Sequence, residues 1–581
     1  MDWERLARTR GSRRWFLGVA GAAAGAAGLT AAGCGGSSPK PTPGASASAT
    51  TGASAASPGA TRTPAGIQLG DTLRYTAYVA SDLQYDPHKT QAGPFYGQQA
   101  MVYSRLLSYS SQTGGTIVPD LAVGKPEQPD GTTLIFKLNP DAKWQDRAPL
   151  NGRPITADDV KYSIERQTAG DASFVRKASL VNIDKVESRD ASTIVITMKA
   201  QQAAMVDLFA DVNSFIVPPE ATTEGRQFSI DSQPGSGPFR WVEWVEGQLG
   251  SVARNAAWFG GSNRPYLDGV AAIQPTDARD VEAGLRTKAL DVAFVGRATA
   301  DRLKQVLPSL QESTVGQLQF FGMRFFIPQF PYNDLRFRSA ISIAIDRRDM
   351  VQRFFGGSGD INPWISWPLS RWTLPQSELS TIPGYRPGSG GRDQDITDAK
   401  ALLAAFAASN KIPDELPLFV VADAETNLQM GSVIRDQLKQ NLGLNVTVYP
   451  VATGELIRRL FAQDAPWAAG PDSSQIDLDD CVYPYFHSAG TQNTFPLRDS
   501  DMDALINAQR AELDEAKRRE IGFNIQRKLL TLNVGVNLVS ERVVALAWPY
   551  VRNFPLDSTD GYQNRFADCW IDKTDPTYRG R

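Results

Sequence analysis

Histidine and cysteine are scarce in this chain. Only two histidines, His88 and His487, and three cysteines occur among its 581 residues. Histidine-based metal sites and acid–base pairs need several such side chains close together, so the composition excludes them. The motifs H-E-x-x-H, C-x-x-C, G-x-x-x-x-G-K-[ST] and G-x-S-x-G are also absent. The sequence therefore gives little support for an enzyme, and we expect no catalytic residue, metal or cofactor.

The chain has no excess of positive charge. Its 60 Lys and Arg residues and 63 Asp and Glu residues give a net charge of -3. Nucleic acid is excluded as a partner, because binding phosphates needs a basic surface. Hydrophobic residues make up 42% of the chain, and its length exceeds the ~250 to 300 residues that one hydrophobic core serves. We therefore expect several lobes.

The amino terminus has the pattern of an export signal. Arg13 and Arg14 precede an Ala/Gly-rich apolar stretch that ends at Ala32, as in twin-arginine signals. Ala and Gly bury little area, and the stretch is at the short end of the ~20 residues that a spanning helix needs. A signal is therefore favoured over the alternative, an uncleaved anchor helix.

Cys34 ends a segment that resembles a lipobox, although Ala31 stands where Leu is preferred. Acyl chains on Cys34 would hold the protein at a membrane surface with ~0.8 kcal/mol per buried CH₂. Residues 35–66 are mostly Ser, Pro, Thr, Ala and Gly and predict a flexible tether. We expect an extracytoplasmic, membrane-anchored lipoprotein. For Cys481 and Cys569, free thiols are favoured over a disulfide.

After residue 66, strand-like segments alternate with helical patterns, which is typical of an α/β protein. Thr156 and Asp159 resemble a capping box that starts a helix at Ala157. Gly443 is expected to end a helix inside a β-α-β unit. The predicted strands are 72–80, 133–138, 193–198, 416–421, 444–451, 536–540 and 542–548, and the predicted helices are 157–167, 335–355, 429–441 and 515–531.

Three separated segments resemble one family of receptors. They are residues 143–146 (KWQD) with 154–163, residues 235–239 (GSGPF) with Arg254, Asn255 and Trp258, and residues 333–347. Their order and spacing are similar to family 5 substrate-binding proteins of ABC transporters, which include oligopeptide, dipeptide and nickel receptors. The resemblance extends over nearly all of residues 67–581.

The resemblance implies a periplasmic-binding-protein-like α/β fold of type II, with three lobes and a ligand cleft between two of them. Lobe I would comprise residues 67–113, 229–327 and 546–581. Lobe II would be inserted at 114–228, and lobe III would be 328–545. Because lobe I is discontinuous, the crossings between lobes would act as a hinge.

Aromatic side chains are the expected walls of such a cleft. The candidates are Trp364 and Trp367 in a Pro-rich stretch, Trp467 in a loop that resembles a family motif, and Phe95 with Tyr96 after the first strand. For each of them, ordinary packing in a core or loop is the alternative.

Polar candidates complete the expected site. Gly235, Ser236 and Gly237 could bring backbone groups close to an extended ligand, although a tight turn explains the glycines equally well. In peptide-binding members an Asp three positions after the Trp pairs with the ligand's amino terminus, and here that position is Gly470. Either Asp472 has taken over this role, or the solute carries no free amine.

The leading hypothesis is a monomeric receptor that captures peptides or peptide-sized solutes by lobe closure and delivers them to an ABC permease. The alternative is a receptor for a non-peptide solute, such as a nickel chelate or a sugar, on the same fold. A secreted hydrolase is a third hypothesis, for which the sequence offers no nucleophile and base.

Overall fold

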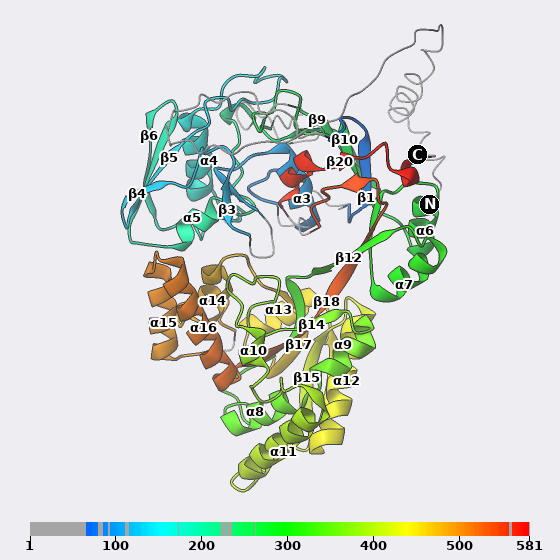
Figure 1. Cartoon of the computed structure of the whole chain (residues 1–581). Coiled ribbons are helices and arrows are strands. Elements are labelled where there is room, and N and C mark those ends of the chain that lie inside the picture. Colours follow the sequence, from blue (N-terminus) through cyan, green and yellow to red (C-terminus); the bar gives the residue numbers. More distant parts are fainter. Residues whose placement is uncertain are drawn as a thin grey trace, which may run out of the picture.

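The computed structural model describes residues 66–79, 85–90, 93–110, 115–171, 173–221, 228, 235–261, 263–494, 496–556 and 561–579. The predicted export signal, Cys34 and the predicted tether lie outside the described residues. Figure 1 shows three groups of elements, with lobe II at the upper left, lobe I at the upper right and lobe III below.

Lobe I is built on a mixed sheet in which β1 pairs in parallel with β10 and β11. Four of the five β1 residues are buried, including Leu73 and Tyr75, so this strand runs through the core rather than along its surface. Its elements are β1 (Thr72–Thr76), α3 (Gly93–Val102), β8 (Phe239–Val245), β9 (Leu249–Arg254), β10 (Gly269–Ile273), α6 (Ala278–Arg286), β11 (Val292–Val295), α7 (Arg297–Val306), β19 (Val551–Arg552), η4 (Gln563–Asp568), β20 (Trp570–Ile571) and η5 (Pro576–Tyr578).

Lobe II is an antiparallel sheet in the order β4-β5-β7-β6, packed against α4. The Asp159 carboxylate accepts a hydrogen bond from the Thr156 backbone N–H at 2.9 Å, so the predicted start of α4 is confirmed. The elements are β2 (Leu107–Tyr109), β3 (Ile117–Pro119), β4 (Glu127–Asp130), β5 (Thr133–Lys137), α4 (Ala157–Ala169), β6 (Ile183–Asp190), β7 (Thr193–Met198), α5 (Ala204–Leu208) and η2 (Pro219–Ala221).

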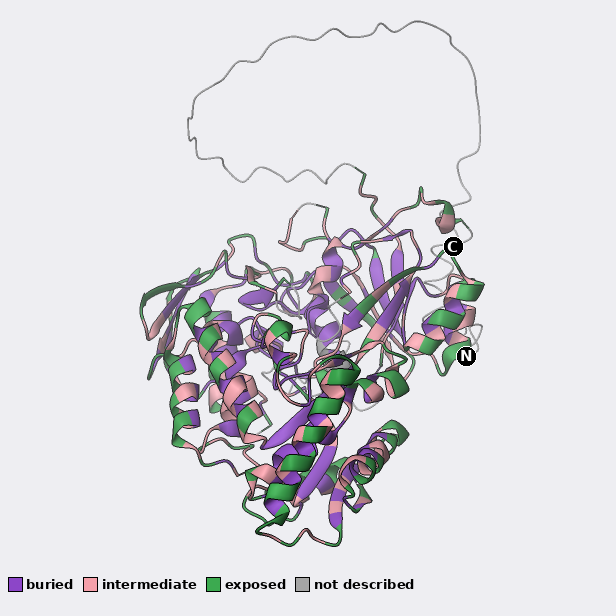
Figure 2. Cartoon of the chain, turned by 60° about the horizontal axis from the view of Figure 1, so that its bottom comes forward, coloured by how far each residue is buried: buried purple, intermediate pink, exposed green. Residues whose placement is uncertain are grey.

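Lobe III contains the predicted β-α-β unit, in which β15 and β16 run parallel and Gly443 ends α12 with a φ of 68°. Its strands are β13 (Gln319–Phe325), β14 (Gly359–Ile361), β15 (Leu416–Val421), β16 (Val446–Val451) and β17 (Trp467–Ser473). Its helices are α8 (Leu335–Ala344), α9 (Arg347–Phe355), α10 (Gln376–Leu379), α11 (Gly388–Ala407), α12 (Glu425–Leu442), α13 (Thr453–Phe461), α14 (Leu478–Phe486), α15 (Ser500–Ala511) and α16 (Glu515–Leu532). Figure 2 shows its strands buried beneath helices with exposed outer faces.

One predicted helix of lobe III is wrong. The structure divides residues 335–355 into α8 and α9, because Asp346 leaves the helical conformation between them. The Asp346 carboxylate accepts hydrogen bonds from the backbone N–H groups of Arg348 and Asp349, both at 3.0 Å. An aspartate that caps a second helix therefore interrupts the apolar periodicity. Gly356 ends α9 with a φ of 57°, as predicted.

Two crossing strands join lobe I to lobe III. Strand β18 (Gly535–Ala547), predicted as two strands, pairs with β13 in its first half and with β11 and β12 (Gln311–Gly316) in its second half. Strand β13 lies ahead of the predicted boundary at residue 328, and we group it with lobe III because it pairs with β17 and β18. The lobe boundaries stay a prediction. In Figure 1, β12 and β18 lie where the upper and lower halves meet. These short crossings are the expected hinge.

Lobes I and II meet at the buried His88. The ring accepts a hydrogen bond from Arg166 Nη1 at 2.8 Å and donates one to the Phe215 carbonyl at 2.7 Å. A guanidinium can only donate and a carbonyl can only accept, so Nδ1 carries no proton and Nε2 carries one. Burial, together with Arg166, lowers the pKa of His88 to about 4.

This lowered pKa predicts that His88 makes the fold sensitive to acid. The neutral ring stabilises the folded state fully above the unfolded pKa of ~6.5, and this contribution is lost as the pH falls toward 4. Relative to a His88→Gln variant, the free energy of unfolding of the native chain should fall by about 3 kcal/mol between pH 7.5 and pH 4. Urea unfolding of both proteins across this range measures the difference. A constant difference would contradict the assignment.

Candidate functional site

The carboxyl ends of three parallel strands meet at one edge of the lobe III sheet. Strand β15 runs parallel to β16 and β17, so Val421, Val451 and Ser473 end on the same side. At this edge Ser473 pairs with Gln319, the first residue of β13 after the crossing from lobe I. The edge therefore faces the hinge. Ligands of open α/β sheets bind at the carboxyl ends of the strands.

A cavity of about 430 Å³ opens at this edge. That volume lies within the range of small-molecule sites, ~300 to 1,000 Å³. Apolar side chains of α13 line it together with the end of β17 and Tyr485 of α14. The lining residues are Gly322, Arg324, Val421, Thr453, Leu456, Ile457, Leu460, Phe461, Ala468, Ala469, Gly470, Pro471, Asp472, Tyr485, Gln492 and Thr494.

An ion pair closes one end of the cavity. Arg324 of β13 donates to the Asp472 carboxylate, and Arg324 Nη1 also donates to Asn537 at 3.3 Å. The guanidinium lies 5.9 Å from the centre of the Phe320 ring and 5.7 Å from that of Trp364, within the range of cation–π contacts. Asp472 is therefore already neutralised by a protein cation. Arg324 was not among the predicted site residues, because pairing with β17 is what brings it to Asp472.

Trp467 lies in the core of lobe III, not on the cavity wall. Its side chain has 0% exposure and packs on Phe325 and Tyr332, with ring centres 5.9 and 6.1 Å away. Gly470 faces the cavity, because residues three apart on a strand point to opposite sides of the sheet. This placement corrects the expectation that Trp467 lines the ligand site.

The other predicted tryptophans lie behind the ion pair. Trp364 is buried and packs edge-on against Phe486 at 5.1 Å. Trp367 is partly buried, and its indole N–H donates to the Ile361 carbonyl at 2.7 Å. Neither lines the lobe III cavity, although Trp364 supports Arg324. Direct solute contact at these two residues stays a prediction.

Phe95, a candidate from lobe I, is also packed inside the fold. Phe95 is buried and contacts the rings of Trp241 and Trp244, 5.8 and 4.9 Å away, so the core alternative holds for it. The Tyr96 side chain lies outside the described part of the chain.

The Gly-Ser-Gly segment packs against the end of α3 rather than against a cavity. A Cβ added to Gly235 would lie 1.9 Å from the Val102 carbonyl oxygen, and the Gly237 N–H donates to that oxygen at 2.8 Å. Ser236 is fully buried, and its hydroxyl accepts from the Ser104 N–H at 3.2 Å. The close backbone approach to α3 explains both glycines without a ligand.

Lobes II and III touch through buried charges. Arg371 of lobe III donates to Asp207 of lobe II at 2.6 Å and to Glu515 at 2.9 Å. The Tyr109 hydroxyl also donates to Asp207, at 2.7 Å. The side chains of Asp207 and Arg371 are 5% and 11% exposed. Burial, with the nearby Asp477 carboxylate, raises the pKa of Asp207. We call Asp207, Arg371 and Glu515 the interlobe clasp.

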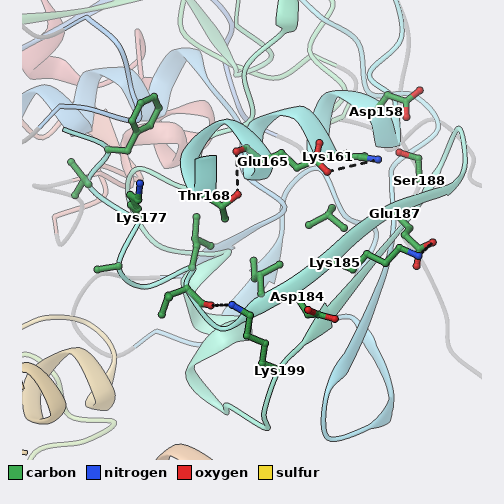
Figure 3. Close-up of a pocket in the computed structure, with 17 residues that line it drawn as sticks. Asp158, Lys161, Glu165, Thr168, Lys177, Asp184, Lys185, Glu187, Ser188 and Lys199 are labelled. Atoms are coloured by element: carbon green, nitrogen blue, oxygen red, sulfur yellow. Dashed lines mark hydrogen bonds and ion pairs between the residues drawn. The ribbon is translucent and has the colours of Figure 1, made fainter. Parts of the chain in front are cut away.

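A larger cavity, of about 1250 Å³, lies between α4 and β6 within lobe II (Figure 3). Its lysines are already engaged: Lys161 pairs with Glu165 at 3.8 Å, and Lys185 pairs with Glu187 at 2.7 Å. Lys199 donates to the Val181 carbonyl at 2.8 Å, as Figure 3 shows. Its lining residues belong to α4, β6 and their connections, and none lies at the carboxyl-end edge of β15 and β17 next to the crossing strands. The lobe III cavity is the better candidate.

Other site chemistry is limited in the described part of the chain. No group of His, Cys, Asp and Glu residues there could hold a metal ion. Among the same residues, no helix combines the length and apolarity needed to span a bilayer. Cys481 and Cys569 are free thiols, as predicted, and burial raises the pKa of both.

Crossing strands join lobe I to lobe III, and a cavity lies at the strand ends that face this hinge. These features define the class of two-part solute receptors. The chain belongs to the bacterial extracellular solute-binding proteins, family 5, whose family model matches residues 116–493. This confirms the family and the fold that the three sequence segments predicted.

Named relatives agree with this assignment. A protein of Brucella ovis described as an ABC transporter peptide-binding protein is 29% identical over 254 residues, and the match spans 42% of this chain and 45% of that relative. The periplasmic oligopeptide-binding protein OppA of Salmonella typhimurium is 24% identical over 416 residues, 67% of this chain and 72% of OppA. The structure of AppA from Bacillus subtilis in complex with a nonapeptide has a TM-score of 0.67, with 19% identity, 87% of this chain covered and 99% of AppA. That last similarity supports the fold.

Proposed function

We propose that this protein captures peptides or peptide-sized solutes by closing lobe III against lobes I and II, and that it delivers them to an ABC permease. The observation that carries the proposal is the cavity at the carboxyl ends of β15 and β17, on the edge that faces the hinge. The names of the Brucella relative and OppA, and the nonapeptide bound by AppA, support peptides as the solute class.

The proposal includes an extracytoplasmic, lipid-anchored location. It rests on Arg13 and Arg14, on the lipobox-like segment that ends at Cys34, and on the tether-like composition of residues 35–66. A monomer held in this way could reach a permease while its lobes stay free to move. Metabolic labelling with a radioactive fatty acid, compared with a Cys34→Ala variant, tests the anchor.

A receptor for a non-peptide solute is the second candidate. It is favoured by the Arg324–Asp472 pair, because Asp472 is already bonded to a cation and Gly470 offers no carboxylate to a peptide amine. A hydrolase has no comparable support, since the relatives named above are binding proteins.

Filling the cavity is expected to weaken solute binding. Ile457 is 49% exposed and lines the cavity from α13, so an Ile457→Trp side chain can occupy the space without disturbing a core. Solute affinity should fall at least about tenfold, because the cavity no longer admits the solute. Val306→Trp is the matched control, since Val306 is 41% exposed on α7 of lobe I, outside the cavity.

The measurement combines two steps. Mass spectrometry of small molecules that co-purify with the native protein identifies the solute class, and calorimetry with peptides of graded length then gives affinities. Recovered peptides support the proposal, and a recovered non-peptide solute supports the second candidate. Equal affinities for the native chain and the Ile457→Trp variant would contradict the cavity as the site.

A further inference from the structure

We propose that the lobe III cavity receives an uncharged, mainly apolar group of the solute and rejects an ammonium group. This inference rests on the proposed function and narrows its substrate class. It would favour peptides that place a Leu-, Ile- or Phe-like side chain in the cavity over peptides that place a lysine or a free amino terminus there.

The α13 wall is apolar and unusually exposed. Ile457 and Phe461 are 49% and 58% exposed, and they lie four positions apart on the helix, so they share one face. Leu456 and Leu460 complete this wall. A solute group that covered these side chains would remove apolar surface from water, which is worth ~25 cal/mol per Å². The wall therefore favours an apolar group over a hydrated one.

The described lining of the cavity carries no net charge. Arg324 and Asp472 are its only charged residues in the part of the chain that the structure describes, and they pair with each other. Asp472 also accepts the Ser473 N–H at 2.8 Å. An ammonium entering the cavity would either stay uncompensated or compete with Arg324 for Asp472, and a desolvated charge without a partner costs several kcal/mol.

Gly470 brings the backbone of β17 against apolar side chains of the cavity wall. A Cβ added there would lie 2.8 Å from Val421 Cγ2 and 3.9 Å from Leu456 Cδ2, so the backbone at Gly470 directly faces apolar side chains. Val421 already fills that space, so glycine is what allows this close contact.

Calorimetry on the intact chain tests the inference with two matched peptide series. One series moves a single Leu-to-Lys change along an otherwise constant apolar peptide, and the other compares free and N-acetylated amino termini. At one position the Lys change should lower affinity at least about tenfold, whereas acetylation should leave it within about threefold. Equal affinity for Leu and Lys peptides at every position would overturn the inference.

Substitutions in the cavity then test whether the preference for Leu over Lys arises there. Gly470→Asp and Ile457→Asp should each lower affinity for the apolar series about tenfold and reduce the preference for Leu over Lys. Ile457→Asp, at an exposed helix position, keeps the test valid if Gly470→Asp fails to fold. Val306→Asp should change neither quantity. Unchanged selectivity in Ile457→Asp would overturn the assignment.

The failure of this inference differs from that of the proposed function. Binding of all peptides without discrimination would refute the inference and leave the receptor function standing. Binding of no peptide by the native chain, alongside a co-purified solute of another class that carries an ammonium, would refute both. Binding of an uncharged, non-peptide solute in the cavity would keep the inference and refute peptides as the substrate.

Discussion

Substitution of Arg371 by Met is expected to weaken solute binding at least about a hundredfold. Arg371 joins lobe III to Asp207 of lobe II at 2.6 Å, and the two side chains are 11% and 5% exposed. Removing one partner of a buried ion pair costs ~3 to 5 kcal/mol. Arg518 lies 4.0 Å from Asp207 and is paired with Asp477, so it is too far away to replace the lost hydrogen bond. When the lobes open, water hydrates the Asp207 carboxylate again. The free-energy cost of the missing Arg371 therefore destabilises only the closed form. Each ~1.4 kcal/mol lowers affinity tenfold.

Calorimetry and small-angle X-ray scattering on the same samples test this prediction for the interlobe clasp. Arg353→Met is the matched control, because Arg353 is 60% exposed and pairs with Asp349 within α9 at 2.7 Å. Exposed pairs contribute ~0 to 1 kcal/mol, so this variant should bind within a few-fold of the native chain. Arg371→Met should also show a larger radius of gyration with solute present. Native-like affinity and scattering for Arg371→Met would show that the clasp does not hold the lobes together.

Substitution of Trp467 by Ala is expected to lower the free energy of unfolding by about 3 to 5 kcal/mol. Trp467 has no exposed surface and packs on Phe325 and Tyr332. Trp467→Phe should cost much less, about 1 to 2 kcal/mol, since it keeps a ring in place. The indole N–H has no hydrogen-bond partner among the described residues, so its removal breaks no bond. Urea unfolding followed by circular dichroism measures both changes.

Trp467 also distinguishes a core role from a ligand role. If the placement in the core is correct, Trp467→Phe should bind solute with native affinity. A tryptophan on the ligand wall would behave in the opposite way: Ala at this position would lower affinity strongly and leave the unfolding transition almost unchanged. That result would return Trp467 to the list of solute contacts.

Local features of the fold were predictable because neighbouring residues determine them. Asp159 caps α4, and Gly443 ends α12 in the left-handed conformation, as the sequence indicated. The break between α8 and α9 was missed, because the apolar spacing of residues 335–355 continues through Asp346. A capping aspartate inside an apolar pattern is ambiguous without its tertiary surroundings.

The candidate site was predictable only in part, because long-range pairing forms it. Gly470 and Asp472 line the lobe III cavity, whereas Trp467 faces the other side of the same strand, and a role of Asp472 in solute binding stays a prediction. The partner of Asp472 is Arg324, 148 positions away, and the partner of Arg371 is Asp207, 164 positions away. No spacing rule in one sequence identifies such pairs, since they depend on how the strands and lobes assemble.

The most direct test of the account is small-angle X-ray scattering of the native chain before and after saturation with the solute identified by mass spectrometry. If lobe III closes against lobes I and II around a solute, the saturated sample should have a smaller radius of gyration than the free protein. The solute should also be recovered chemically unchanged. Identical scattering profiles at a saturation confirmed by calorimetry would contradict capture by lobe closure.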